Sequence, residues 1–429
     1  MFRHASEHVD SYYAHSCKDR LTHHPVLQGD LQCEVLVIGA GFSGLHTALR
    51  LAEAGRRVIL LEASRVAWAA SGRNGGQAIL GWSCDMPPLE KALGIERARR
   101  LWDGMTWAAR ELRELPQRHG FDCDYRHGHL WTAVLPRRVA LLHEWQEEAA
   151  YKWGHRALQF VSREQMPQWV ASERYRAGLY DPEAGHLNPL KLALGLAEAF
   201  VRAGGQIFEQ SRALSQDVHG DGYRVRTGQG RVQADTLVLA CNTYIDRLEP
   251  RLARRILPVG TYQIATEPLG AERAEALLPR NACVTDNQFV LDYFRRTPDH
   301  RLLFGGGCTY LGGLPKDMAA ATRPFLERVF PQLAGVAIDF AWGGHIDITR
   351  ARTPDVGGEN GRYWLQGFSG HGVLPTLAAA RAVSDAILGN DDELALYQQL
   401  HNRQFPFGER LAAPLEAIGK AWYRLRDSF

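Results

Sequence analysis

A glycine-rich turn near the N-terminus carries the first chemistry that the sequence offers. It follows directly on the apolar run 35–38 and consists of Gly39, Ala40, Gly41, Phe42, Ser43 and Gly44. In such a turn Gly39 permits the tight bend, Gly41 lets the backbone approach a pyrophosphate, and Gly44 lets the next helix pack closely on the strand. The N–H groups at the start of that helix would attract the phosphates. The turn therefore predicts a dinucleotide site.

An acidic residue stands where a dinucleotide would place its ribose. Glu62 lies 62 − 39 = 23 residues after Gly39 and directly follows the second apolar run, 58–61, with Ala63 behind it. A carboxylate at this position accepts hydrogen bonds from a ribose diol. A lone glycine motif could merely connect two elements, but here the strand, the helix, the second strand and the acid all stand in the expected order. The motif leaves open whether the dinucleotide is NAD or FAD.

Two further glycine-rich segments offer backbone amides to a ligand. Glycines let such amides come close to a planar ring or to phosphate oxygens. For the first segment, composition alone makes a flexible surface loop an equal alternative. The candidate residues are Ser71, Gly72, Arg73, Asn74, Gly75, Gly76 and Gln77 in the first segment and Gly370, His371 and Gly372 in the second.

The segment 342–352 carries the candidates for reaction chemistry. If it is extended, His345 and Asp347 face the same side, where they could bind an amine or position a proton acceptor. Arg350 could bind a carboxylate. The structural alternatives are a histidine hydrogen-bonded between two domains and an arginine on the surface. No metal site is predicted from this or any other cluster.

These residues need elements that hold them in place. Continuous apolar runs predict parallel strands covered on both faces at 35–38, 58–61, 236–240 and 363–365. Ala240, at the end of the third run, would face the dinucleotide. The run 260–266 alternates as antiparallel strands do. The predicted fold class is α/β, with a Rossmann-like nucleotide-binding domain interleaved with a substrate domain of antiparallel sheet and helices.

The pieces of the two domains alternate along the chain without a clean linker. The first thirty residues are polar and rich in histidine, which favours a solvated arm. The predicted ranges are 1–30 for this N-terminal arm, 31–88, 171–245 and 341–392 for the nucleotide-binding domain, 89–170 and 246–340 for the substrate domain, and 393–429 for a C-terminal packing segment.

Composition narrows the function classes. The 429 residues are 45% apolar and 23% charged, as in soluble globular chains. A formal net charge of +2 gives no electrostatic footprint for nucleic acid. No apolar run approaches the roughly 18 residues of a membrane-spanning helix, and residues 1–7 lack the apolar core of a signal peptide. We therefore expect a cytoplasmic protein with no nucleic-acid partner and no membrane span.

Taken together, the motifs resemble a known family. They are similar to those of the FAD-dependent amine and amino-acid oxidoreductases, which include D-amino-acid oxidase, glycine oxidase and monomeric sarcosine oxidase. Within this family the likeness is greatest to the γ-glutamylputrescine oxidases. The similar segments extend over nearly the whole chain, at 11–14, 35–62, 70–77, 181–182, 185–189, 302–307, 367–372 and 421–427.

The resemblance implies an extended FAD in the Rossmann-like domain. Its adenosine would lie on Glu62, its pyrophosphate on the Gly39 turn, and its ring against the loop 73–77. The helix after 369–372 would point its positive N-terminal end at the flavin and favour the reduced, anionic ring. Some relatives attach the flavin to a cysteine shortly before a Thr-Pro-Asp-like sequence, but 348–352 contains none. We therefore expect noncovalent FAD.

The resemblance also implies the reaction. A CH–NH bond would be oxidised to an imine that is then hydrolysed, and O2 or an electron-transfer acceptor would reoxidise the flavin. Sarcosine oxidase-like members hold the substrate carboxylate with an arginine and a lysine, whose places are taken by Ala78 and Leu374, so simple N-methylglycine chemistry is not expected.

Several substrates and functions remain open at this point. The first expectation is a γ-glutamylated polyamine in polyamine catabolism, although 342–352 is more polar than in γ-glutamylputrescine oxidases. The alternatives are L-pipecolate or another amino acid, as in lysine catabolism, an NAD-dependent dehydrogenase, and a flavoprotein without enzyme activity.

Overall fold

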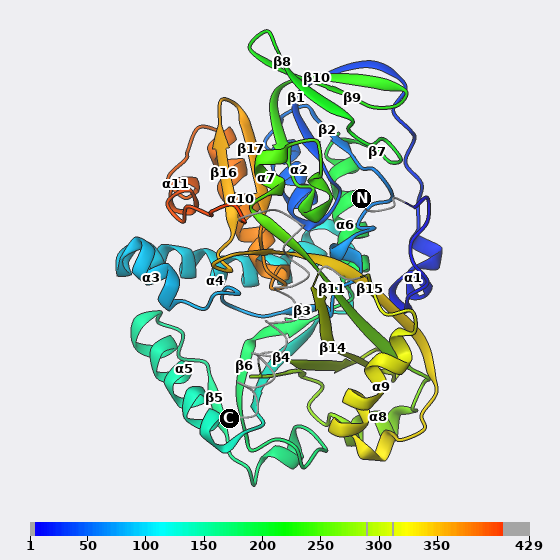
Figure 1. Cartoon of the computed structure of the whole chain (residues 1–429), viewed down its shortest axis with the longest axis vertical. Coiled ribbons are helices and arrows are strands. Elements are labelled where there is room, and N and C mark those ends of the chain that lie inside the picture. Colours follow the sequence, from blue (N-terminus) through cyan, green and yellow to red (C-terminus); the bar gives the residue numbers. More distant parts are fainter. Residues whose placement is uncertain (1–4, 289–290, 311–312, 406–429) are drawn as a thin grey trace.

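Two large β-sheets form the frame of the protein (Figure 1). The computed structural model describes residues 5–288, 291–310 and 313–405. Within these ranges one sheet has eight strands and is mainly parallel, and the other has nine and is mainly antiparallel. The fold is therefore α/β, with a Rossmann-like, mainly parallel sheet and a second, antiparallel sheet with its own helices, as predicted.

The first sheet contains all four strands predicted from apolar runs. Its order is β16-β17-β10-β1-β2-β7, and the β8–β9 hairpin extends from β10. The strands from β17 to β7 run parallel to their neighbours. The run 35–38 is buried along its whole length because both faces of the sheet are covered. The strands are β1 (Gly29–Ile38), β2 (Val58–Leu61), β7 (Gln206–Phe208), β8 (Ser215–His219), β9 (Gly222–Arg226), β10 (Gly230–Leu239), β16 (Asp355–Glu359) and β17 (Arg362–Gln366).

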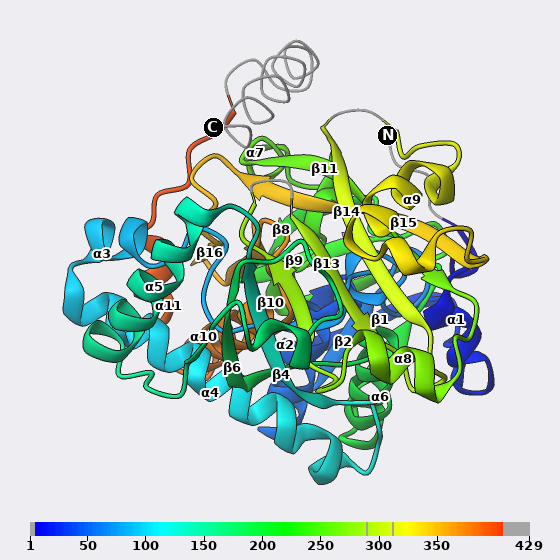
Figure 2. The same ribbon diagram turned by 90° about the horizontal axis from the view of Figure 1, so that it is seen from below.

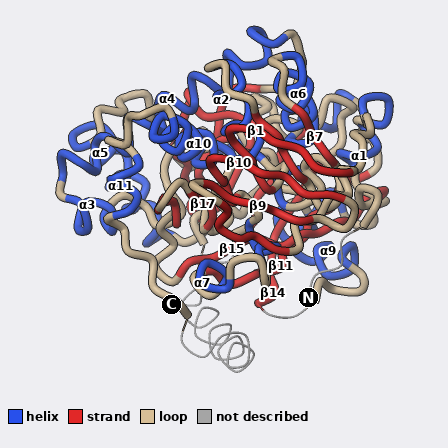
Figure 3. The backbone as a smooth tube through the Cα atoms, turned by 90° about the horizontal axis from the view of Figure 1, so that it is seen from above, coloured by secondary structure: helices blue, strands red, loops and turns tan. Residues whose placement is uncertain are grey.

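Helices cover one face of this sheet, as the blue segments beside β1 and β10 show in Figure 3. Their apolar sides form one large core with that face. The opposite face packs against the β8–β9 hairpin and the short helix α7 (Pro250–Ala253). The covering helices are α2 (Phe42–Glu53), α4 (Ile95–His119), α6 (Pro189–Arg202) and α10 (Val373–Ile387).

The second sheet has the order β15-β11-β14-β13-β12-β4-β6-β3, with β5 beside β6. Only β12 and β4 run parallel among its described pairs. Figure 2 shows α9 and α5 at opposite ends of this sheet, where each covers its own small core. The elements are β3 (Gln77–Ala78), β4 (Arg126–Ala133), β5 (Gln159–Val161), β6 (Ala177–His186), β11 (Ile256–Thr266), β12 (Cys283–Asp286), β13 (Asp292–Arg296), β14 (Leu302–Tyr310), β15 (Ile338–Thr349), α5 (Val139–Lys152), α8 (Ala271–Leu277) and α9 (Met318–Val329).

The strand pairing differs from the predicted domain ranges at three places. Strands β3 and β6 and most of β15 fall in ranges assigned to the nucleotide-binding domain, yet all three pair in the second sheet. Conversely, α4 falls in the predicted substrate range but packs on the core of the first sheet. Apolar patterning predicts a strand but not the sheet it joins, and this chain crosses between the sheets without a linker.

The expectation of a solvated N-terminal arm is wrong where the arm packs on the protein, at 11–13, 17 and 27, whereas the other residues of 5–30 are exposed or half-buried. Helix α1 (Tyr12–Ser16) begins at Ser11, whose Oγ accepts a hydrogen bond from the Ala14 N–H. Tyr12 and Tyr13 are buried at its start, and Cys17 is buried behind it. A helix of five residues is too short to show an apolar period, so the sequence pattern missed it.

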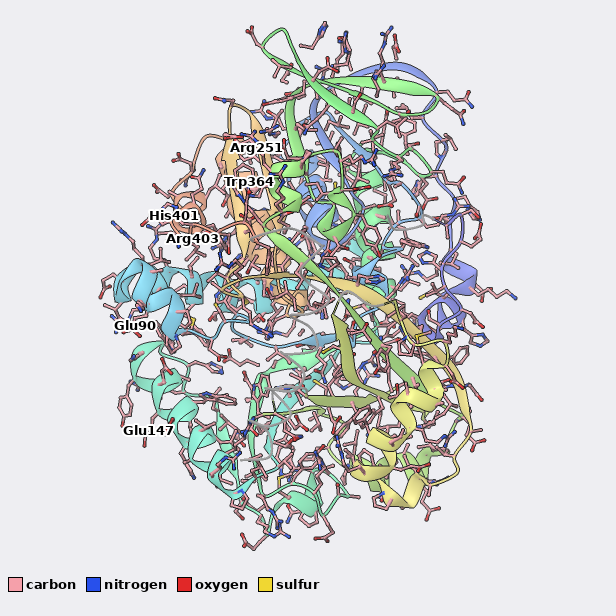
Figure 4. All side chains as sticks on the ribbon, viewed as in Figure 1. Glu90, Glu147, Arg251, Trp364, His401 and Arg403 are labelled. Carbon is pink, nitrogen blue, oxygen red and sulfur yellow. The ribbon has the colours of Figure 1, made fainter. Side chains whose placement is uncertain are left out.

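Two smaller helices complete the described part. Helix α3 (Pro87–Leu93) lies beside α5, and the Lys152 Nζ at the end of α5 forms an ion pair of 2.8 Å with Glu90, which Figure 4 labels. Helix α11 (Leu394–Gln398) belongs to the predicted C-terminal packing segment, most of which, 406–429, lies outside the described residues. No helix in the described ranges is both long and apolar enough to cross a membrane.

Candidate active site

A cavity of about 1470 Å³ is lined by residues of both sheets. Leu61 and Ala240 contribute from the ends of β2 and β10, and Leu179 and Thr285 contribute from the second sheet. Pockets for single small ligands usually measure about 300–1,000 Å³. The cavity can therefore hold a ligand as large as a dinucleotide together with a second small molecule.

Most of the residues predicted to bind the cofactor line this one cavity. They come from five separate stretches of the chain, which the fold brings together. Five others, Ala40, Gly44, Gly72, Arg73 and Gly76, lie outside the lining and support it from behind. The predicted residues in the lining are Gly39, Gly41, Phe42, Ser43, Glu62, Ala63, Ser71, Asn74, Gly75, Gln77, Ala240, Gly370, His371 and Gly372.

The glycine turn has the close packing that its pattern predicts. Gly39 has a φ of +109°, and a Cβ there would lie 2.4 Å from the Ala240 carbonyl oxygen. At Gly44 a Cβ would lie 1.8 Å from the Gly39 carbonyl oxygen. Only glycine fits either position, so β1, the turn and α2 can meet without side chains between them. The backbone of the turn consequently faces the cavity.

Glu62 is held in place by the same turn. Its carboxylate accepts the Ala40 N–H at 2.9 Å and the Ser64 N–H at 2.8 Å. Burial raises the pKa of Glu62 to about 6, in spite of these two bonds. Each carboxylate oxygen keeps a lone pair. The geometry therefore suits an acceptor for the hydroxyls of a ribose.

The loop 70–77 is ordered by its own side chains, so the alternative of a flexible surface loop is wrong. Ser71 Oγ accepts the Phe42 N–H at the start of α2 at 2.9 Å. Asn74 Oδ1 accepts the Gly76 N–H at 2.8 Å. The Gln77 amide is fixed at both ends, since its oxygen accepts the Thr285 hydroxyl at 2.8 Å and its nitrogen donates to the backbone.

Arg73 braces the loop from outside the cavity. Its Nε donates to the Trp68 carbonyl at 2.6 Å and its Nη1 to the Gly343 carbonyl at 3.1 Å. The guanidinium also lies 4.2 Å from the centre of the Trp68 ring. In the other direction, the Arg73 carbonyl accepts the indole N–H of Trp342 at 3.1 Å. The side chain thus ties the loop to β15.

The second glycine segment brings a helix end to the cavity. Gly370 has a φ of +84° and Gly372 is the N-cap of α10, which has 15 residues and no side-chain cap. His371 Nε2 lies 2.9 Å from the Ile79 carbonyl and must donate to it. Burial lowers the pKa of His371, which favours the neutral ring. The positive end of α10 therefore faces the cavity without a side-chain anion on it.

The three predicted catalytic residues do not form one site. Asp347 lines the cavity, is buried, and accepts the Gly367 N–H; burial raises its pKa to about 7. His345 lies outside the lining. Arg350 is exposed and donates to the Gln404 carbonyl at 3.4 Å. The surface alternative for Arg350 therefore holds, because β15 ends at Thr349, just before it.

Sequence reasoning missed several polar groups at the far end of the cavity. His155 Nε2 lies 3.2 Å from Asp181 Oδ2, and both side chains are buried. Burial lowers the pKa of His155, but the hydrogen bond and the charge of Asp181, together with the charge of Glu183, outweigh burial and leave the pKa raised. Asp286 is also buried there, and burial together with nearby Asp292 raises its pKa. His155 lies between α5 and β5, whereas Asp181 and Asp286 lie on β6 and β12, so these residues form no local motif.

Aromatic side chains complete the far wall. They come from β4, from the first half of α4, and from α5 and the residue that follows it. The Trp131 and Trp145 rings meet edge to face at 5.6 Å. This wall gives an apolar surface next to the buried acids, and it consists of Trp102, Trp131, Trp145 and Trp153.

The donor set suits a dinucleotide better than a metal ion. No group of three histidine, cysteine, aspartate or glutamate residues in the described ranges could hold a metal. A side-chain-free turn, a ribose acceptor and the N-termini of α2 and α10 all open into one cavity. An extended molecule with a diphosphate and a planar ring would meet each of these features.

A dinucleotide cradle on a parallel sheet, facing an antiparallel sheet across a large cavity, is typical of two-domain flavoprotein oxidoreductases. The family model "FAD dependent oxidoreductase" (DAO) matches residues 34–386. The chain belongs to this family and is an FAD-dependent oxidoreductase. Of the two dinucleotides that the motif left open, FAD is thus the cofactor, and the readings as an NAD-dependent dehydrogenase or a nonenzymatic protein fall away.

Individual relatives agree with this assignment. The chain is 40% identical over 424 residues to the γ-glutamylputrescine oxidoreductase of Escherichia coli, covering 98% of this chain and 99% of that one. It is 38% identical to the "probable oxidoreductase OrdL" of Haemophilus influenzae, covering 99% and 98%. The crystal structure of L-proline dehydrogenase from P. horikoshii has the same fold, with a TM-score of 0.74 and 18% identity over 87% of this chain and 98% of that one.

Proposed function

We propose that this enzyme oxidises the CH–NH bond of a γ-glutamylated polyamine to an imine, which water then hydrolyses, in polyamine catabolism. The observation that carries the proposal is the 40% identity to γ-glutamylputrescine oxidoreductase over nearly the full length of both chains. Ala78 and Leu374, at the places of the sarcosine oxidase carboxylate clamp, are apolar, buried and outside the cavity lining, so neither can bind a substrate carboxylate. This supports a substrate that is not held by its carboxylate at these two places.

Bound FAD would supply the electron acceptor, and the residues of the chain would hold and orient it. Glu62 would hold the ribose, the Gly39 turn would hold the diphosphate, and the loop 70–77 would contact the ring. The N-terminus of α10 would favour negative charge on the ring as it is reduced. No strong base is needed in this scheme, provided that the amine is bound in its neutral form.

Among the predicted catalytic residues we retain Asp347 as a positioning residue. Its carboxylate accepts the Gly367 N–H and its carbonyl accepts the Ser369 N–H at 2.9 Å, so it sets the start of the turn before α10. For contact with the substrate we propose the buried Asp286 and the aromatic wall. A buried carboxylate favours a cationic or hydrogen-bonding amine group.

We further propose that FAD is bound noncovalently. Cys84, Cys241 and Cys308 line the cavity. Burial raises the pKa of the Cys84 and Cys241 thiols to about 12, which disfavours the thiolate that either would need to attack a flavin. Precipitation of the protein with acid should release all of the flavin into the supernatant. Yellow colour that stays with the pellet would contradict the proposal.

The substrate is tested by anaerobic reduction of the flavin. The purified enzyme is mixed with γ-glutamylputrescine, with putrescine and with L-pipecolate, and the loss of the visible flavin band is followed. We expect rapid bleaching with γ-glutamylputrescine only. L-Pipecolate is the second candidate, but Arg350, its predicted carboxylate partner, lies outside the cavity. Equal inactivity with all three amines would defeat the proposal. Release of peroxide during turnover in air would then identify O2 as the electron acceptor that reoxidises the flavin, and turnover without peroxide would indicate another acceptor.

A further inference from the structure

The N-terminal arm reaches the cofactor loop through a buried arginine. Arg295 of β13 is 2% exposed, and its guanidinium donates to the Gly75 carbonyl at 2.8 Å through Nε and to the Tyr13 hydroxyl at 3.0 Å through Nη2. Tyr13 itself is fully buried. The Tyr13 hydroxyl is thus linked to the Gly75 peptide by two hydrogen bonds, both donated by the Arg295 side chain. Gly75 lines the cavity.

A second contact joins the same tyrosine to the other half of the loop. The rings of Tyr13 and Trp342 meet edge to face at 5.3 Å, and the Trp342 indole donates to the Arg73 carbonyl at 3.1 Å. Tyr13 therefore supports the loop at two carbonyls, those of Arg73 and Gly75, through two different side chains.

The loop has little freedom to move away from these supports. Gly76 has a φ of +71°, and a Cβ there would lie 2.1 Å from the Leu187 carbonyl oxygen. A Cβ at Gly75 would lie 2.7 Å from the Tyr293 ring. The backbone is thus pressed against β13 and the end of β6, and the acceptors on the loop have fixed directions.

Arg295 is also unusual in its charge. Within the described ranges no carboxylate forms an ion pair with it, and its hydrogen-bond acceptors are two backbone carbonyls and the Tyr13 hydroxyl. A buried cation that relies on neutral acceptors loses much of its stabilisation when any one is removed. Loss of the Tyr13 hydroxyl should therefore disturb how Arg295 holds Gly75.

We infer that the N-terminal arm is part of the flavin-binding apparatus. Tyr13, through Arg295 and Trp342, is a positioning residue that fixes the loop 70–77 against the bound flavin. Tyr13 touches neither the cofactor nor the substrate in this role. Besides these contacts, the inference needs only the assignment of the chain to the FAD-dependent oxidoreductase family. It does not depend on which amine is the substrate.

The chain provides a matched control in the preceding residue. Tyr12 lies on the same short helix and is also buried, but its hydroxyl donates to Asp299 at 2.8 Å and does not lead to the loop. Tyr12→Phe and Tyr13→Phe each remove one hydroxyl from the arm. A general loosening of the arm would affect both variants alike.

The experiment measures the release of FAD from the holoenzyme. We expect Tyr13→Phe to release FAD about tenfold faster on dilution, followed by flavin fluorescence, because a hydrogen bond to a charged group is lost. The fine structure of the bound flavin absorption band should change as well. Tyr12→Phe should stay within about twofold of the wild type. Tyr13→Leu should exceed Tyr13→Phe, since it also removes the ring contact with Trp342.

Thermal unfolding of each variant separates loop positioning from general stability. The inference is overturned if Tyr12→Phe and Tyr13→Phe release FAD at the same rate, or if both leave the rate and the flavin spectrum unchanged. Trp342→Phe, which keeps an aromatic ring but loses the indole N–H, provides an independent arm. It should also speed release, and an unchanged rate would argue against the second route.

Discussion

The two ends of the cavity are built in different ways. At the cofactor end, the Gly39 turn, the loop 70–77 and the start of α10 line the cavity, and the five glycines among their lining residues present only backbone atoms, beside side chains such as Ser43 and Gln77. At the far end the wall consists of side chains, the tryptophans of β4 and α5 and the buried acids of β6 and β12. A backbone wall suits a ligand that never changes, whereas a wall of side chains can change with the substrate.

The largest effect should follow from a methyl group at the cofactor end. In Gly39→Ala the Cβ would meet the Ala240 carbonyl at 2.4 Å in a left-handed conformation. We expect a loss of about 3 kcal/mol in the free energy of unfolding and no retained FAD. Denaturant unfolding and the flavin absorbance of the purified protein measure these.

Gly55→Ala is the matched control for this change. Gly55 has a φ of +81° but no atom within 4 Å of a Cβ. The Gly55→Ala variant should lose about 1 kcal/mol in the free energy of unfolding, from backbone strain alone, and should keep its FAD. If Gly39→Ala and Gly55→Ala behaved alike, close packing at the turn would not matter for the cofactor.

The far end should respond to mutation in substrate affinity and leave the cofactor bound. Trp145→Ala removes one of the two rings that meet edge to face. We expect KM for the amine to rise about tenfold, as for the loss of a partly buried aromatic contact, with FAD release unchanged. Tyr151→Ala on the same helix, where the ring is 82% exposed, should change neither quantity. Loss of FAD from Trp145→Ala would contradict the proposal that the far end binds the substrate while the other end binds the cofactor.

A pH profile tests the buried acid at the far end. Burial and the nearby Asp292 raise the pKa of Asp286 above its value in the unfolded chain, so the folded protein binds this proton more tightly. Its contribution to stability is complete below the unfolded pKa and is lost as the pH rises through the raised folded pKa.

Asp286→Asn cannot ionise, so it should be more stable than the wild type at pH 8 by on the order of 2 kcal/mol. The difference should shrink as the pH falls toward 4, in urea unfolding without substrate. The exposed Asp221→Asn serves as control. A difference that does not depend on pH would refute the assigned direction.

The smallest effect should come from the surface pair that joins α3 and α5. Lys152→Ala removes the ion pair with Glu90, and both side chains are partly exposed. We expect a melting temperature close to that of the wild type and an unchanged KM. Glu147→Ala, an exposed acid on the same helix that Figure 4 labels, gives the reference. A clear rise of KM in Lys152→Ala alone would mean that the position of α5 depends on this pair.

The same contrast explains what the sequence could predict. The strands at 35–38 and 58–61, the turn between them and Glu62 lie within one βαβ unit, so their contacts are local and their pattern is visible. Asp181 and Asp286 meet the cavity only because β6 and β12 both pair with β4. No short-range pattern contains that information, and the polar residues of the far end were therefore missed.

Two other errors have the same physical origin. The arm was expected in solvent because single buried rings such as Tyr13 leave no period in the sequence, although their partners Arg295 and Trp342 lie far along the chain. Arg350 was a plausible ligand by residue type, but its position one residue beyond β15 turns it to the surface. Tyr13 is buried because of contacts with residues far along the chain, and Arg350 is exposed because its position after β15 gives it no such contact in the cavity.

The last feature concerns the order in which the chain is made. The cavity takes part of its wall from β17 and from the start of α10, near residue 373, whereas the glycine turn stands at residue 39. During synthesis from the N-terminus, a growing polypeptide thus carries the diphosphate cradle long before it can close around a flavin. Until most of the chain has left the ribosome, the apolar faces of the first strands must be protected by other means, such as chaperones.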